Sequence, residues 1–519
     1  MPGKKKIARN WVKSARLLRE RLLEDPWRPR FHFAIPEDLG MPGDVNACFH
    51  ANGRYHLMYL YERTGVGFSF GHMSSADLVH WRCHPDALSP GDGDEGCYSG
   101  GAFVDTDGTA YIAYWMLPGA LGIGIAQAYG PNFEKWKKFP SNPVIKGTEY
   151  GLTETVDADG NPIALACADP SNIWKKNGQY YLCAGNLTVL NKHGRDGNSP
   201  IQYRGDHLTL YESEDLRSWT PKGDFYERKT DGRWTDESED NMCPSFLPLP
   251  SSPHGGPPSD KHLLLFISHN RGCQYYVGRY NLSSDRFQPE EHGRMSWTDN
   301  AFFAPESLLD SKGRQIMWAW LFDNPSDHKS RGWSGVFALP RTLWLGDDNC
   351  LRMAPVPELQ ILRGNERQWR DLVLEDFENY RLEGVTGDAC ELEVEIGSCC
   401  SSAIKAGVKV LTSPDGEEET LIYHDSKKGE LCFDTRKSGI DGRHVLEKAP
   451  LVLHEGEALN LRVFVDTSVV EVFANDRQAI CRRVYPGRRD SLGIFLIAEG
   501  GRVQFSQVKA WDISPSNMF

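Results

Sequence analysis

Two aspartates occupy the same place relative to a turn, which makes them candidates for chemistry. Asp44 lies nine residues before Gly53 of an Asn-Gly turn, and Asp169 lies nine residues before Gly178 of another. Both open segments that are first polar and then apolar, "DVNACFH" and "DPSNIWK". A lone Asp is usually a turn or cap residue. Because these two share a repeat position and enter apolar strands, where unpartnered carboxylates are costly, we predict a functional role.

Carboxylates that converge on one funnel suit the cleavage of a glycosidic bond. One carboxylate attacks the anomeric carbon while a protonated partner delivers a proton to the leaving oxygen. A retaining enzyme holds the pair about 5–5.5 Å apart. Neighbouring carboxylates in a dry site push their pKa values apart, so that one stays ionised and the other protonated. The 15 Trp and 19 Tyr residues suit stacking on sugars and suit a packed core equally well.

Turn residues followed by a Tyr-, Ile- and Leu-rich run recur at intervals of roughly 50–80 residues, a period typical of propellers and solenoids. The runs are "NGRYHLMYLY" from Asn52, "DGTAYIAYWM" from Asp107, "NGQYYLCAG" from Asn177, "SDKHLLLFIS" from Ser259 and "KGRQIMWAW" from Lys312. A second phrase follows some of them, as in "SSADLVHW" ending at Trp81 and "SEDLRSW" ending at Trp219. Helical periodicity is nearly absent. We therefore predict an all-β fold, a five-bladed β-propeller, with a large sandwich as the competing arrangement.

The segment before each turn supplies the innermost strand of its predicted blade. In a propeller these strands line the central channel, so equivalent positions face one axis. Ser99 occupies this position in the second blade, and "MCPSFLP" (242–248) and "APESLLD" (304–310) are the fourth and fifth copies. The repeat therefore predicts that Asp44 and Asp169 are neighbours in space.

The chain is predicted to contain two domains, since 519 residues are too many for one ordinary core. The propeller is expected over 31–363, after a basic helical extension at 1–30. Beyond it, short alternating strands separated by Gly, Asp and Ser turns predict a β-sandwich over 385–519, with 364–384 as a linker. Within the sandwich phrase "LRVFVDTSVVEVFANDRQ", Asp466 and Glu471 are expected to be surface or turn charges.

Charge and composition exclude several classes of partner. A net charge of −13 argues against a general nucleic-acid binder, and no apolar run is long enough to span a bilayer. The N-terminus lacks the apolar region of a secretory signal, and thirteen cysteines without regular C-x-x-C spacing favour reduced thiols. We predict a cytoplasmic protein that binds no nucleic acid and no membrane. No metal-ligand spacing and no phosphate loop occurs, so we expect no metal and no cofactor.

Five phrases resemble motifs of glycoside hydrolase family 32, the invertase, inulinase and levanase group. They are "GDVNA" (43–47) for N-D-P-N-G, "FGHMSSADLVHW" (70–81) for W-G-H-x-x-S-x-D-L-x-H-W, "YSGGAFVD" (98–105) for S-G-S, "ADP" (168–170) for R-D-P, and "MCPSFLPL" (242–249) for E-C-P-D-F-F-P-L. The resemblance runs from about Phe31 to Arg363 and, in weaker form, to the C-terminus. It implies a propeller followed by a sandwich.

The resemblance also implies roles for single residues. Asp44 matches the nucleophile that forms a fructosyl-enzyme, and Asp169 matches the carboxylate that holds the sugar hydroxyls and stabilises the transition state. Asn46, Tyr98 and Ser99 fall where the family contacts the terminal fructosyl unit. These assignments imply a retaining enzyme that releases or transfers terminal β-D-fructofuranosyl units from sucrose or fructans.

The chain departs from the family motifs at positions that bear on catalysis. Val45 and Ala47 replace Pro and Gly of the first motif, Ala168 replaces the Arg before Asp169, and Met242 replaces the acid/base Glu. Methionine cannot donate a proton. Nearby carboxyl groups are therefore candidates for the donor: Glu239 first, then Asp240, with Glu306 on the fifth inner strand as a third.

Two other functions remain open at this stage. The altered motifs allow a fructosyltransferase, including one that forms or cleaves a difructose anhydride, in which a sugar acceptor replaces water. They also allow an inactive carbohydrate-binding propeller, which would hold no carboxyl group opposite Asp44. The substrate is expected to be a small sugar or an oligosaccharide, and formation of a homo-oligomer stays open.

Overall fold

The computed structural model describes residues 2–35, 43–157, 159–227, 234–323, 331–385, 387–397 and 403–517. It divides into two compact units. The repeat unit comprises Pro42–Trp320 and Pro340–Glu358, and the terminal unit comprises Met1–Met41, Leu321–Leu339 and Leu359–Phe519. Beyond helix α1 (Pro2–Glu24), the short α2 (Leu187–Val189) and single helical turns, the regular structure in these ranges is β. The all-β prediction is confirmed, and no described helix is long and apolar enough to cross a bilayer.

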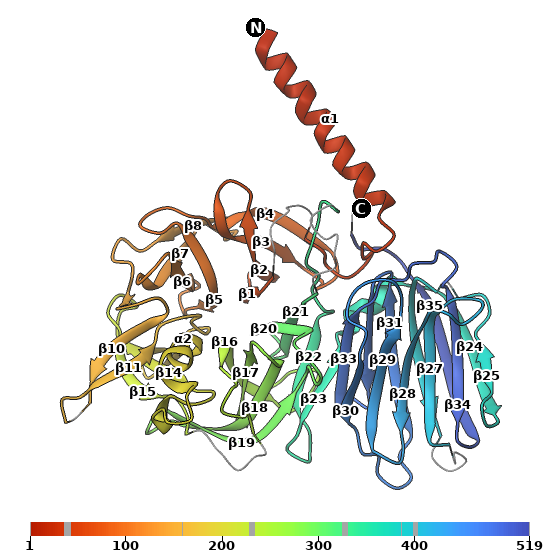
Figure 1. Ribbon diagram of the computed structural model, residues 1–519. Helices are drawn as coiled ribbons and strands as arrows, with labels where there is room; N and C mark the ends of the chain where they lie inside the picture. The colour runs from red at the N-terminus through yellow and green to blue at the C-terminus, as the bar shows by residue number, and fades with distance from the viewer. Residues whose placement is uncertain are drawn as a thin grey trace. The chain divides into compact units, whose positions relative to one another are not determined.

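The described part of the repeat unit contains five antiparallel sheets built on a four-strand meander in chain order, four of them with four strands and one with a short fifth strand (Figure 1). The sheets are β1 (Val45–Ala51), β2 (Arg54–Arg63), β3 (Gly67–Ser75) and β4 (Trp81–Leu88); β5 (Gly96–Val104), β6 (Ala110–Leu117), β7 (Gly122–Tyr129) and β8 (Lys135–Lys138); β12 (Trp174–Lys176), β13 (Gln179–Gly185), β14 (Leu208–Ser213) and β15 (Thr220–Asp224); β16 (Met242–Pro250), β17 (Pro258–Ser268), β18 (Gly272–Asn281) and β19 (Arg286–Arg294); β20 (Phe302–Leu309), β21 (Gln315–Leu321), β22 (Arg341–Leu345) and β23 (Leu351–Pro355). Strand β9 (Ile145–Lys146) pairs with β7, and β10 (Leu152–Val156) with β11 (Pro162–Ala166).

Each repeated run of the sequence forms the second strand of one sheet, and the segment before it forms the first strand. The turn between them explains the repeat. Asn52 and Gly53 have φ angles of 51° and 71°, the positive values that a two-residue type I′ hairpin requires at both positions. The same turn recurs at Asn177 and Gly178, whose φ angles are 51° and 85°. A sequence that repeats this turn before apolar alternation therefore repeats the hairpin.

The first strands contact one another in a closed series. Strand β1 packs on β5 and β20, and β16 packs on β20. Close to β12, Asn172 lies so near β5 that a Cβ on Gly101 would stand 2.2 Å from its backbone nitrogen. The amide side chain of Asn172 exchanges two hydrogen bonds with the backbone of Phe246 in β16. Residues at equivalent positions of these strands are thus brought to one region.

Apolar side chains fill the spaces between successive sheets. Phe49 and Met58 of the first sheet pack with Ile112 and Tyr114 of the second, and all four are buried. Similar clusters join the second sheet to the third and the third to the fourth. Burying one large apolar side chain contributes roughly 1.5–3 kcal/mol, so these contacts hold the first strands in register with one another.

The terminal unit contains two six-stranded antiparallel sheets (Figure 1). In spatial order they are β24 (Arg363–Leu374), β35 (Val503–Ile513), β26 (Ala389–Ile396), β31 (Leu459–Asp466), β32 (Val469–Ala474) and β33 (Gln478–Arg483); and β25 (Asn379–Arg381), β34 (Gly493–Glu499), β27 (Lys405–Thr412), β28 (Glu419–Asp425), β29 (Glu430–Lys437) and β30 (Leu446–Pro450). The sequence analysis expected a linker at 364–384. The structure corrects this, because strands β24 and β25 occupy most of these residues. Strand β24 is largely polar, so the search for apolar alternation in the sequence did not identify it.

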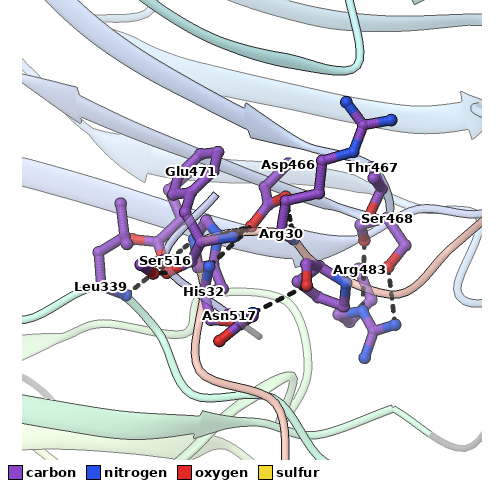
Figure 2. Close-up of polar contacts among 12 residues, drawn as sticks. Arg30, His32, Leu339, Asp466, Thr467, Ser468, Glu471, Arg483, Ser516 and Asn517 are labelled. Carbon is purple, nitrogen blue, oxygen red and sulfur yellow. Dashed lines mark hydrogen bonds and ion pairs between the residues drawn. The ribbon is translucent and has the colours of Figure 1, made fainter. Parts of the chain in front are cut away.

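Asp466 and Glu471 are also corrected, since both are fully buried rather than surface charges. Figure 2 shows them on either side of His32, whose Nδ1 lies 2.9 Å from Asp466 and whose Nε2 lies 3.1 Å from Glu471. Asp466 also accepts hydrogen bonds from the backbone N–H groups of Arg30, Phe31 and His32. Burial opposes the charge on His32, but the hydrogen bonds to the two carboxylates raise its pKa above the ordinary value. A buried charge is tolerated here because it is paired on both sides.

Candidate active site

Asp44 is held just before β1 by a backbone hydrogen bond and by close packing of the preceding Gly43 against Trp320. Its carbonyl accepts a hydrogen bond from the Leu60 N–H, which extends the β1–β2 pairing by one residue. A Cβ on Gly43 would stand 2.7 Å from the indole of Trp320, so only glycine fits before Asp44. A bulge interrupts the pairing between Asn46 and Cys48. Bulges redirect side chains next to functional sites, and strands β5 and β16 carry bulges at their equivalent ends.

Asp169 occupies a strained backbone position that recurs in two other sheets. Its φ angle is 37°, and the corresponding Cys243 and Ala304 have φ angles of 49° and 44°. All three are non-glycine residues in the left-handed region, and each precedes a proline. Such strain persists only where the surroundings enforce it, commonly at functional sites. The sequence repeat is therefore accompanied by a repeated backbone conformation, a positive φ angle near the start of the inner strands.

The two aspartates meet at one thiol. The Sγ of Cys243 lies 3.4 Å from Oδ2 of Asp169 and 3.6 Å from Oδ2 of Asp44. The hydroxyl of Ser99 donates a hydrogen bond to the same Asp44 oxygen. The structure thus brings together Asp44, Asp169 and Ser99, which lie far apart in the sequence, and it adds Cys243, which the sequence analysis had not singled out.

Burial controls the charge of this pair. Burial raises the pKa of Asp44, and the hydrogen bond from Ser99 and the charge of His269 oppose that rise. Burial and the neighbouring charge of Asp44 raise the pKa of Asp169 to about 7. Two carboxyl groups in one dry site ionise in separate steps that belong to the pair. The site therefore holds one carboxylate and one carboxyl group that titrates near neutrality.

An unpartnered amide and an aromatic cluster lie beside the pair. Asn46 is buried, and neither its Oδ1 nor its Nδ2 has a partner among the described residues. Tyr98 packs edge-on against Trp115 at 5.4 Å, and Tyr150 packs in a tilted arrangement against the same indole at 4.6 Å. Burial raises the pKa of both tyrosines, and the charge of Asp169 adds to that rise. Buried amides and aromatic rings are the groups that bind sugars.

Glu239 is found in an environment opposite to that of a proton donor. Its carboxylate accepts hydrogen bonds from both guanidinium nitrogens of Arg294, at 2.7 and 2.9 Å, and from the Gln274 amide at 2.9 Å. Burial opposes the charge, but Arg294 outweighs it and holds the pKa of Glu239 below its usual range. A carboxylate that is ion-paired and ionised at neutral pH has no proton to give.

The other two candidate carboxyl groups also differ from their expected roles. Asp240 is 1% exposed, and its two oxygens accept hydrogen bonds from the backbone N–H and from Nδ1 of His269. Those contacts leave it without a face for a substrate. Glu306 is buried, its Oε1 has no partner among the described residues, and burial raises its pKa well above the usual range. Burial therefore favours the uncharged form of this carboxyl group.

The substitutions that break the sequence motifs are accommodated by packing. Met242 is 1% exposed, and its sulfur accepts a hydrogen bond from the Leu187 N–H at 3.4 Å. A Cβ on Gly185 would stand 2.5 Å from that sulfur. Ala168 is fully buried and pairs through its backbone with Gly185. Neither position offers a charge or a proton to a ligand. Within the described ranges, no group of His, Cys, Asp and Glu side chains is arranged to hold a metal ion.

Comparison with known proteins gives matches over almost the whole chain. The profile described as glycosyl hydrolases family 32 N-terminal domain matches residues 32–355, and the family's C-terminal profile matches 358–512. A sucrose-6-phosphate hydrolase from Zymomonas mobilis is 28% identical over 96% of this chain and 94% of its own length. A levanase from Bacillus subtilis is 27% identical over 95% of this chain and 73% of its own length. Fructan 1-exohydrolase IIa from Cichorium intybus shares the fold, with a TM-score of 0.78 at 21% identity over 95% and 98% of the two chains.

Proposed function

The chain belongs to glycosyl hydrolase family 32, and we propose that it is a retaining β-fructofuranosidase that releases or transfers terminal β-D-fructofuranosyl units. Its relatives support fructosyl hydrolase activity, because they include a sucrose-6-phosphate hydrolase, a levanase and a fructan 1-exohydrolase. The observation that carries the retaining mechanism is the pair of buried carboxyl groups, Asp44 and Asp169, at the Cys243 thiol.

In this proposal, Asp44 forms the covalent fructosyl-enzyme. An oxygen of its carboxylate attacks C2 of the fructosyl unit while the bond from C2 to the leaving oxygen breaks. Asp169 faces the ring hydroxyls, and its negative charge stabilises the positive charge that develops on the sugar. Water then attacks C2 from the other side and releases Asp44. Transfer to a sugar acceptor follows the same path with the acceptor in place of water.

Three further residues are proposed to bind the fructosyl unit. The unpartnered amide of Asn46 supplies both a donor and an acceptor for hydroxyl groups. Tyr98 provides an aromatic face, and Ser99 fixes the orientation of the Asp44 carboxylate through its hydrogen bond. A buried amide without a partner is costly, so its retention supports a polar ligand at this place.

The architecture proposed for this function is a five-bladed propeller followed by a sandwich. The closed series of first strands and the five meanders support the blades, and the two six-stranded sheets support the sandwich. The propeller is proposed to cover 31–363, and the sandwich is proposed to begin with β24 rather than at 385 and to run to 519, because β24 pairs with β35.

Substrate assays test this function directly. We expect the purified chain to release fructose from at least one of sucrose, sucrose 6-phosphate, 1-kestose, inulin and levan. Because two displacements at C2 retain configuration, NMR of early product should show β-fructofuranose before mutarotation. Transfer activity would appear as longer oligosaccharides at high substrate concentration. Binding without turnover for all five sugars would instead support an inactive carbohydrate-binding protein.

The pH dependence of kcat/KM is expected to report Asp169. Because this carboxyl group must be ionised to stabilise the transition state and its pKa is about 7, activity should rise as pH increases through an apparent pKa near 7. An unperturbed aspartate would place this limb near pH 3.8. Initial rates from pH 4 to 9 measure the limb. Activity that instead increases toward acid pH would mean that the protonated form of Asp169 is required.

A further inference from the structure

The proposed reaction needs a proton donor, and none of the carboxyl groups expected from the sequence suits that task. The leaving oxygen of a sugar must be protonated as its bond to C2 breaks. Met242 carries no proton, and Glu239 is an ionised partner of Arg294. Glu306 is buried, and its Oε1 contacts no polar partner within the described ranges. Another acid must therefore reach this pair.

His269 lies at the end of the sheet where that acid is required. Strand β17 pairs antiparallel with β16, and its residue Ile267 stands opposite Met242. His269 follows Ile267 by two residues and directly follows the end of β17 at Ser268. The register of the two strands thus places His269 opposite Asp240, two residues before β16 begins at Met242.

The ring of His269 is fixed by one carboxylate. Its Nδ1 lies 2.7 Å from Oδ2 of Asp240, and its backbone N–H donates to Oδ1 at 3.1 Å. The side chain of His269 is 47% exposed, whereas that of Asp240 is 1% exposed. Its Nε2 has no hydrogen-bond partner within the described part of the chain, so this nitrogen is available to a ligand. A buried carboxylate that holds Nδ1–H leaves a charged imidazole with one free N–H, which is the arrangement of a general acid.

The acidic groups near His269 favour its charged form. Burial disfavours the imidazolium, but the hydrogen bond and charge of Asp240, followed by the charges of Asp169 and Asp44, raise the pKa of His269 above its ordinary value. In return, the charge of His269 lowers the pKa of both Asp44 and Asp169. Ring contacts connect His269 to the Asp44 segment, because Phe303 packs on both His269 and Trp320 and the indole of Trp320 lies against Gly43. Phe303 packs edge-on against the ring at 5.8 Å and limits its rotation.

We propose that His269 is the catalytic acid and base of this site, with Asp240 as its positioning residue. The inference rests on the function proposed above. As the bond from C2 to the leaving oxygen breaks, that oxygen takes the proton from Nε2 of His269, and Asp44 forms its bond to C2. In the second step, Nε2 takes a proton from water while the water oxygen bonds to C2 and Asp44 leaves. The proton balance closes with water alone.

Glu239 acquires a supporting role in this arrangement. Its partner Gln274 donates a hydrogen bond to the Ser268 hydroxyl at 2.6 Å, and that hydroxyl donates to the backbone carbonyl of Asp240 at 2.7 Å. The ion pair with Arg294 therefore anchors the network that holds the Asp240 segment against the end of β17. A Glu239→Gln variant should lower stability and affect all substrates alike.

The test compares leaving groups that do and do not need a proton. In His269→Gln, kcat/KM for sucrose should fall between about 10²- and 10⁴-fold, because general acid catalysis contributes that much. In p-nitrophenyl β-D-fructofuranoside the phenolate leaves without a proton. For this substrate, the rate constant of the first step should fall less than about tenfold. Azide should rescue turnover of this aryl substrate and yield fructosyl azide, since an anion needs no base. Asp240→Asn should show the same preference for the aryl substrate with a smaller loss.

Matched variants separate this inference from the proposed function. His254→Gln, at an exposed histidine, should leave both rates unchanged. Asp44→Asn should abolish both, and if it does not, the proposed function itself fails. Equal losses on both substrates in His269→Gln, or selective retention of aryl activity in Asp169→Asn instead, would overturn the assignment of His269 and leave the nucleophile in place.

Discussion

Replacing Asp44 by asparagine is expected to lower kcat for the best fructoside on the order of 10⁴-fold or more. The amide keeps the shape of the side chain but removes the nucleophile, and removal of a catalytic nucleophile commonly leaves only this residual rate. Rapid-quench mass spectrometry of the wild-type enzyme with p-nitrophenyl β-D-fructofuranoside should detect a fructosyl adduct on the peptide that contains Asp44. The variant should show no adduct.

The control for this variant is its stability. Burial raises the pKa of Asp44, so keeping its charge inside the fold is unfavourable. Asp44→Asn is therefore expected to unfold at the same temperature as the wild type or at a higher one, a common relation between activity and stability. Ser99→Ala, which removes only the hydrogen bond to Asp44, should lose much less activity. Residual activity in Asp44→Asn close to the wild-type value would exclude Asp44 as the nucleophile.

The largest expected effect on stability belongs to Asp466. Asp466→Ala leaves His32 with one carboxylate, and it leaves three backbone N–H groups, two of them buried, without their acceptor. Removal of one partner from a buried ion pair costs about 3–5 kcal/mol. We expect the apparent free energy of unfolding, measured by urea titration with tryptophan fluorescence, to fall by that amount.

A neighbouring charge supplies the control. Asp388 pairs with the side chain of Arg30 at 2.7 Å, but both side chains are partly exposed, at 27% and 44%. Exposed ion pairs contribute less than about 1 kcal/mol. Asp388→Ala should therefore leave the unfolding curve nearly unchanged. If the two substitutions had equal effects, the buried network around His32 would not be the source of the stability.

The sequence was informative where the structural signal is local. Turn chemistry and apolar alternation over about ten residues predicted the first two strands of the sheets in the repeat unit. At Asn52–Gly53 and Asn177–Gly178 the turn is a type I′ hairpin, which is determined by the residues within it. The recurrence of these hairpins then predicted that Asp44 and Asp169 would be neighbours. In the structure, both aspartates contact the thiol of Cys243. They meet there because the segments before the turns form the first strands, and these strands contact one another.

Features that depend on distant partners were not predicted. His269 reaches the site through the register of β16 and β17 and through Asp240, 29 residues earlier. The partner of Asp466 is 434 residues away, so its phrase looked like an exposed strand. Strand β24 is mostly polar, and its hydrogen bonds go to β35 at the other end of the domain. Tyr150 lies outside the repeated phrases of the sequence.

The contacts of residues 30–32 decide where the chain can be divided for separate study. His32 is the first residue matched by the N-terminal family profile, yet its side chain sits between two acids of the segment matched by the C-terminal profile. A fragment cut at residue 358 would enclose two negative groups with no cation between them. A soluble C-terminal half therefore requires the peptide around His32 to be supplied, either fused by a flexible connector or added in trans.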